Sequence, residues 1–190
     1  MAEVLLFHHA HGLTEGVLDF ASQLRSAGHA VHVPDLYDGH VFKSLEEGLG
    51  YARDTGFGAV LDRGVRAADD LPAELFYAGF SLGVMPAQQL AQTRPGARGA
   101  LFFHACLPAS EFGSWPDSVP VQVHAMEADP FFIEEDGDLD AARALVTEVD
   151  EADLFLYPGD EHLFADPSLP TYDADASALL MKRVLEFLQD

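Results

Sequence analysis

The hydrophobic pattern of the chain alternates between short, almost wholly apolar runs and longer amphipathic stretches. A short apolar run is typical of a strand in a parallel sheet, because helices cover such a strand on both faces. The runs that predict strands lie at residues 4–9, 30–34, 75–79, 100–104, 119–125 and 154–157.

The amphipathic stretches are long enough to form the helices that connect one parallel strand to the next. They predict helices at residues 14–27, 44–52, 57–69, 82–93, 139–149 and 173–188. The last stretch has the clearest period, since Leu180, Val184 and Leu188 recur at four-residue spacing.

Strand and helix alternate along the whole chain, so the pattern predicts an α/β fold with a mostly parallel, doubly wound sheet and helices on both faces. No insertion between the later strands is long enough for a separate cap, and residues 1–190 are expected to form a single domain. Ligands of such a sheet bind beyond the carboxyl ends of its strands, which is where candidate chemistry should lie.

Acidic residues dominate the charge of the chain. Asp and Glu number 32 against 10 Lys and Arg, a formal net charge of -22, which disfavours nucleic acids and anionic membranes as partners. The single cysteine, Cys106, cannot form an internal disulfide, and the sequence begins without the features of a signal peptide. We therefore expect a cytoplasmic protein, a monomer or homodimer, that acts on a small molecule.

One motif carries specific chemistry. Gly79-Phe80-Ser81-Leu82-Gly83 follows a predicted strand and precedes a predicted helix. This is the context of a nucleophile elbow, in which a sharp turn raises the serine hydroxyl above the sheet and small residues on either side prevent collisions. Ser81 is thus the predicted nucleophile. The alternative is a chance match, in which Ser81 only caps the helix.

A serine nucleophile needs a general base and an acid that orients it, in the chain order acid and then histidine. Asp129 follows the strand predicted at 119–125, and His162 follows the strand predicted at 154–157. Both are predicted members of a triad with Ser81. Rival residues are Glu127, Asp136 and Asp138 for the acid, and His104 and His124 for the base.

Several motifs together resemble the dienelactone hydrolase family of α/β-hydrolases over nearly the whole chain. They are Pro34-Asp35-Leu36-Tyr37, the elbow around Ser81, Asp129-Pro130, Tyr157-Pro158-Gly159 leading into His162-Leu163-Phe164, and Tyr172 before a long terminal helix. The resemblance implies a carboxylic ester or lactone hydrolase with Ser81, Asp129 and His162 as triad and no cofactor. It also implies that the backbone N–H groups of Ala10 and Leu82 form the oxyanion hole.

The substrate is expected to meet side chains near this site, for which the candidates are His9, His11, Tyr37, Trp115, Phe131 and Phe164. The chain departs from the family pattern in three ways. Serine stands where dienelactone hydrolases proper use cysteine, His9 aligns with their first-loop glutamate, and Asp166 aligns with a carboxylate-binding arginine. A carboxylate at the pocket mouth would repel anionic substrates, so we expect Asp166 to favour neutral esters.

Two other classes of function remain open. A metal-dependent hydrolase could use the cluster of His8, His9 and His11, although its spacing does not support a particular zinc motif. A non-catalytic binding domain could keep the same fold. The glycines after the first strand do not form a dinucleotide-binding loop, so no cofactor is predicted.

Overall fold

A parallel sheet of six strands organises the protein, in the order β2-β1-β3-β4-β5-β6. The structure is a computed structural model that describes residues 1–133 and 137–189. The strands are β1 (Glu3–Phe7), β2 (Ala30–His32), β3 (Phe76–Phe80), β4 (Gly99–Phe103), β5 (Val121–Met126) and β6 (Ala152–Tyr157). The predicted α/β class with a parallel, helix-covered sheet is confirmed.

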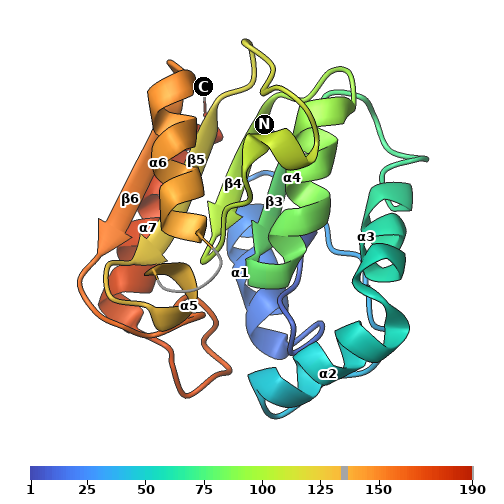
Figure 1. Ribbon diagram of the computed structural model, residues 1–190, viewed down its shortest axis with the longest axis vertical. Helices are drawn as coiled ribbons and strands as arrows, with labels where there is room; N and C mark the ends of the chain where they lie inside the picture. The colour runs from blue at the N-terminus through green and yellow to red at the C-terminus, as the bar shows by residue number, and fades with distance from the viewer. Residues whose placement is uncertain (134–136, 190) are drawn as a thin grey trace.

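Helices cover both faces of the sheet, and Figure 1 shows α4 and α6 on the near face with α1 and α7 behind it. The helices are α1 (Glu15–Ser26), α2 (Leu45–Thr55), α3 (Phe57–Arg66), α4 (Val84–Thr93), α5 (Pro130–Ile133), α6 (Asp138–Glu148) and α7 (Ala174–Phe187). Short 3-10 turns lie at η1 (Ser81–Gly83) and η2 (Ala109–Glu111).

The alternation of side chains along each strand divides the core into two clusters. On β1, Leu5 and Phe7 pack in one cluster with residues of α3, α4 and α6, whereas Val4 and Leu6 pack in the other with α1 and α7. Burial on both faces is the reason that the strands are apolar at nearly every position.

Side chains that accept backbone N–H groups fix where several helices begin. Thr14 accepts from the N–H of Val17 at the start of α1, and Asp173 accepts from that of Ala176 at the start of α7. Ser44 begins α2 with a reciprocal capping box to Glu47. The first of these caps matters for the site, because the Thr14 hydroxyl also holds a buried carboxylate described below.

The structure differs from the predicted elements mainly at their ends. The predicted strand at 4–9 ends at Phe7, and the predicted helix at 82–93 begins with the 3-10 turn η1. The short helix α5 was not predicted. Asp136, a rival for the triad acid, lies outside the described residues. None of the helices within the described ranges is long and apolar enough to cross a membrane.

Candidate active site

Ser81 stands on a strained turn between β3 and α4. Its backbone φ is +48°, in the left-handed region that residues other than glycine rarely adopt. A Cβ atom at Gly79 would overlap the carbonyl group of Gly83, and one at Gly83 would overlap the carbonyl groups of Phe7 and of the residue after it. Glycine at both positions therefore lets the turn close tightly against the end of β1.

A hydrogen-bonded chain links Ser81 to a histidine and an aspartate from two later loops. The Oγ of Ser81 lies 3.0 Å from Nε2 of His162, and Nδ1 of His162 lies 2.6 Å from Oδ2 of Asp129. Asp129 is fully buried, and its Oδ1 accepts a hydrogen bond from the N–H of Phe131 at 2.9 Å. The carboxylate therefore favours the tautomer in which Nδ1 of His162 donates, which leaves Nε2 to accept a hydrogen bond from the hydroxyl of Ser81.

The order of the strands explains how these residues meet. β3, β5 and β6 run parallel in one sheet, on either side of β4, so the loops after their carboxyl ends lie at the same edge of the sheet. Asp129 follows β5 and His162 follows β6. The rival acid Glu127 has an exposed side chain, and the rival base His124 lies within β5, bonded to Tyr157 and Gln122.

A second buried hydrogen-bond network lies near the candidate triad of Ser81, His162 and Asp129. Nε2 of His9 donates to Oδ2 of Asp166 at 2.7 Å, and the hydroxyl of Thr14 donates to the same oxygen at 2.6 Å. Burial opposes the charge of Asp166, but hydrogen bonds from His9, Ser168 and Thr14 outweigh it and lower the pKa of this carboxyl to about 2. Burial in turn lowers the pKa of His9, so a neutral imidazole faces an ionised carboxylate.

The two other histidines of the first loop have separate partners. Nδ1 of His8 lies 2.8 Å from the carbonyl oxygen of His9, and its Nε2 accepts from the N–H of Leu36 at 2.9 Å. Burial lowers the pKa of His8 to about 4. Nδ1 of His11 lies 3.1 Å from the carbonyl oxygen of Phe42.

These contacts correct the hypothesis of a metal centre at the cluster of His8, His9 and His11. Each ring is committed to a different protein atom, and no group of three potential ligands gathers within residues 1–133 and 137–189. The rings instead brace the loop after β1, which carries Ala10. The sequence does not predict this bracing role, for which its only signal is the density of histidines next to a predicted strand end.

His104, the other rival for the base, directly follows β4, and the sequence did not indicate its surroundings. It is fully buried, its φ is +67°, and neither ring nitrogen has a hydrogen-bond partner among the described residues. Its ring stacks edge-on against His162 at 5.7 Å and against Phe164 at 4.8 Å between centroids. Burial lowers the pKa of His104 well below that of a free histidine, so the ring is neutral.

Two hollows open beside the candidate triad, one lined by Ser81 and the other by His162. The Ser81-side hollow, of about 460 Å³, is lined by Ser81, Leu82 and mostly apolar residues that include Leu49, Phe57, Met85, Leu107 and Pro108. The His162-side hollow, of about 220 Å³, is lined by His162, His11, Phe131 and neighbouring residues that include Leu45, Asp160, Glu161 and Thr171.

The lining corrects several predicted substrate contacts. His11 and Phe131 line the His162-side hollow, but Tyr37, Phe164, Trp115 and His9 are buried and line neither hollow. Trp115 donates its indole N–H to the carbonyl oxygen of Val119 and packs on Phe102. Tyr37 packs among His8, Phe42 and Tyr51 instead.

Asp166 also differs from its predicted place at the pocket mouth. Only 1% of its surface is exposed, because His9, Thr14 and Ser168 surround the carboxylate. The carboxylate is ionised but lies inside the protein, so it does not form the mouth of either hollow. The expected position of Asp166 at the pocket mouth is therefore wrong.

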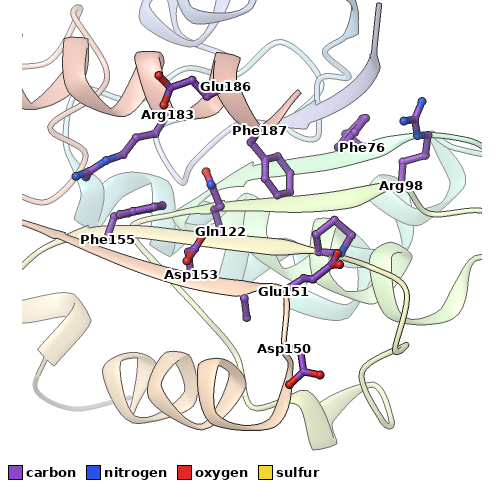
Figure 2. Close-up of a pocket in the computed structure, with 12 residues that line it drawn as sticks. Phe76, Arg98, Gln122, Asp150, Glu151, Asp153, Phe155, Arg183, Glu186 and Phe187 are labelled. Carbon is purple, nitrogen blue, oxygen red and sulfur yellow. The ribbon is translucent and has the colours of Figure 1, made fainter. Parts of the chain in front are cut away.

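A further hollow, of about 550 Å³, lies away from this chemistry. It is lined by Phe76, the first residue of β3, and by Arg98, Ala152 and Arg183, near the amino ends of the strands and along α7. Figure 2 shows Arg183 and Arg98 on two sides of this hollow with aromatic rings between them. Arg183 stacks on Phe155 at 4.2 Å, so its guanidinium is already engaged.

The parallel sheet, with the strained turn after β3 and the loops that meet above it, defines an α/β-hydrolase. The model of the family described as the dienelactone hydrolase family matches residues 1–190. The chain belongs to the dienelactone hydrolase family, and it is a hydrolase.

Solved structures of related proteins share the fold. A promiscuous, dienelactone hydrolase-like phosphotriesterase from metagenomic libraries is 22% identical with a TM-score of 0.75, covering 100% of this chain and 86% of that one. A provisionally assigned dienelactone hydrolase from Klebsiella pneumoniae subsp. pneumoniae is 18% identical with a TM-score of 0.73, covering 100% and 87%. A cold-adapted esterase from an Arctic intertidal metagenomic library is 16% identical with a TM-score of 0.66, covering 98% and 82%. A search of curated protein sequences gave no match.

Proposed function

We propose that the protein is a serine hydrolase that cleaves small carboxylic esters or lactones through an acyl-enzyme. The observation that carries this proposal is the continuous hydrogen-bonded chain from Ser81 through His162 to buried Asp129. Nucleophile and base are within hydrogen-bond reach, and the base is oriented by a third group, which is the arrangement that activates an alcohol of ordinary acidity.

In the first half of the reaction, Nε2 of His162 takes the proton of Ser81 as Oγ attacks the ester carbonyl carbon. The electrons of the carbonyl bond move to its oxygen, which the backbone N–H groups of Ala10 and Leu82 stabilise. When the tetrahedral intermediate collapses, the bond to the alcohol oxygen breaks and His162 donates its proton to that oxygen. The products are a free alcohol and an acyl ester of Ser81.

In the second half, His162 takes a proton from a water molecule that attacks the acyl-enzyme. The new intermediate expels Ser81, which recovers its proton from His162, and the carboxylic acid leaves. Asp129 accepts the Nδ1–H of His162 throughout and stabilises the imidazolium form in both halves. A lactone follows the same steps, with alcohol and acid on one product molecule.

The test is the Ser81→Ala variant, compared with Ser22→Ala, which removes an exposed hydroxyl on α1 that lines neither hollow. Hydrolysis of p-nitrophenyl acetate should fall by about a thousandfold or more in Ser81→Ala and stay near the wild-type rate in Ser22→Ala. Intact-mass measurement after treatment with a fluorophosphonate should show one adduct on the wild type and none on Ser81→Ala. An unchanged ester turnover by Ser81→Ala would refute the proposed mechanism.

A further inference from the structure

Each of the two hollows is lined by a different member of the Ser81–His162 pair. Ser81 lines only the larger hollow, and His162 lines only the smaller one. Carboxylates occur in both: Glu111 and Asp138 in the Ser81-side hollow, and Asp160 and Glu161 in the His162-side hollow. No lysine or arginine is among the residues that line either hollow in the described part of the chain.

The proposed mechanism assigns each half of an ester to one hollow. The leaving oxygen must receive its proton from Nε2 of His162, so the alcohol portion has to lie on the histidine side. The acyl portion stays attached to Ser81 Oγ and extends into the larger hollow. The walls of that hollow are mostly apolar, which suits a hydrocarbon acyl chain.

The His162-side hollow combines an aromatic ring with two carboxylates. The ring of Phe131 is 52% exposed and lies 4.8 Å from the ring of His162 between centroids. Asp160 and Glu161 are exposed and precede His162 in the same loop. An exposed aromatic face beside carboxylates attracts a cation, in particular a substituted ammonium group whose own hydration is weak.

We propose that the preferred substrates are esters of an apolar acid with a small, positively charged alcohol, with Phe131, Asp160 and Glu161 as the residues that select the charge. The proposal rests on the serine-hydrolase function above and adds the substrate class to it. The long-range field of a chain with a net charge of -22 acts in the same direction, but salt screens that field more strongly than it screens close contacts.

Three esters of the same acid distinguish the effect of the alcohol's charge from the effect of its shape. They are butyrylcholine, the isosteric ester in which a carbon atom replaces the quaternary nitrogen, and an ester of matched length whose alcohol ends in a carboxylate. Acid release is followed by titration, because none of the three carries a chromophore. At low ionic strength, kcat/KM should be about fivefold higher for the cation than for its isostere, and lowest for the anion.

Matched variants decide whether the effect is local. The double variant Asp160→Asn, Glu161→Gln should bring the ratio of cation to isostere close to one while hydrolysis of the isostere continues. Asp19→Asn, which neutralises an exposed carboxylate on α1, should leave that ratio unchanged.

Equal or reversed preference in the wild type, or an equal loss of preference in Asp19→Asn, would overturn the proposed substrate class. Ester hydrolysis that depends on Ser81 would still stand in either case. If the protein hydrolyses none of the three esters and no p-nitrophenyl ester, the proposed function itself fails, and the substrate class with it.

Discussion

Lowering the pH from 7 to 5 should destabilise this protein strongly, because it buries neutral histidines. His8 and His124 are fully buried. Burial lowers the pKa of His8 to about 4 and that of His124 to about 3. Both values lie below the ordinary histidine pKa of about 6.5, which the unfolded chain keeps. At pH values between the folded and the unfolded pKa, the unfolded chain binds protons that the folded protein does not. The free energy of unfolding therefore falls as the pH falls through this range.

The size of the loss follows from the two pKa values of each histidine. From pH 7 to pH 5, protonation of one unfolded histidine stabilises the unfolded chain by about 2 kcal/mol, and the folded state gains almost nothing. His8 and His124 together should therefore remove about 4 kcal/mol from the free energy of unfolding, which is a large share of the roughly 5–15 kcal/mol typical of a domain. The lowered pKa values of His9 and His104 act in the same direction.

Urea unfolding at fixed ionic strength measures this loss. The single tryptophan, Trp115, is buried, so its fluorescence reports unfolding directly. In His124→Asn the absolute stability will change through lost packing, but the difference between pH 7 and pH 5 should shrink by about 2 kcal/mol. If His124→Asn loses as much stability as the wild type over this range, the buried histidine does bind its proton in the folded state and the reasoning is wrong.

Four further predictions concern single residues. Asp129→Asn should lower kcat by about a thousandfold or more, and Glu127→Gln should have little effect; the reverse ranking would move the acid to Glu127. Asp166→Asn should cost about 3 kcal/mol in urea unfolding, because its partners lose a buried charge; an unchanged midpoint would contradict this. Met85→Trp should fill part of the Ser81-side hollow and lower kcat/KM for butyrate relative to acetate esters by about tenfold; an unchanged ratio would remove the acyl group from that hollow. Burial raises the pKa of the Cys106 thiol to about 12, so thiol reagents at pH 8 should label it only after denaturation; rapid labelling of the native protein would disprove its burial.

The strands could be predicted because burial on both faces leaves a direct mark on the sequence. Strand β3, for example, is buried at every position and reads as an apolar run. The predicted strand at 4–9 was too long because His8 and His9 leave the sheet to bond with loop atoms. Polar residues at a strand end carry no local signal of where the backbone turns.

The order of the candidate triad was also readable, since each member follows a strand. Side-chain contacts between distant segments could not be predicted from the sequence. His9 and Asp166 lie 157 positions apart, and their pairing depends on how the loops after β1 and β6 pack together. Trp115 was assigned to the pocket by residue type alone. A tryptophan whose indole N–H bonds to a backbone carbonyl oxygen, as this one does to Val119, can equally be part of the core.

Residue 104 is a position at which stability and activity are expected to favour different side chains. The buried imidazole of His104 forms no hydrogen bond within the described ranges, and the backbone φ of this residue is +67°. Both features cost stability, and glycine or asparagine would relieve the backbone strain. Selection for heat resistance alone should therefore enrich substitutions at residue 104. The ring touches His162, so the same substitutions should be depleted when ester hydrolysis is selected as well. A library of all residues at position 104 could be selected in parallel for heat resistance alone and for heat resistance with ester hydrolysis. The difference between the two outcomes would measure how much thermal stability the native histidine costs.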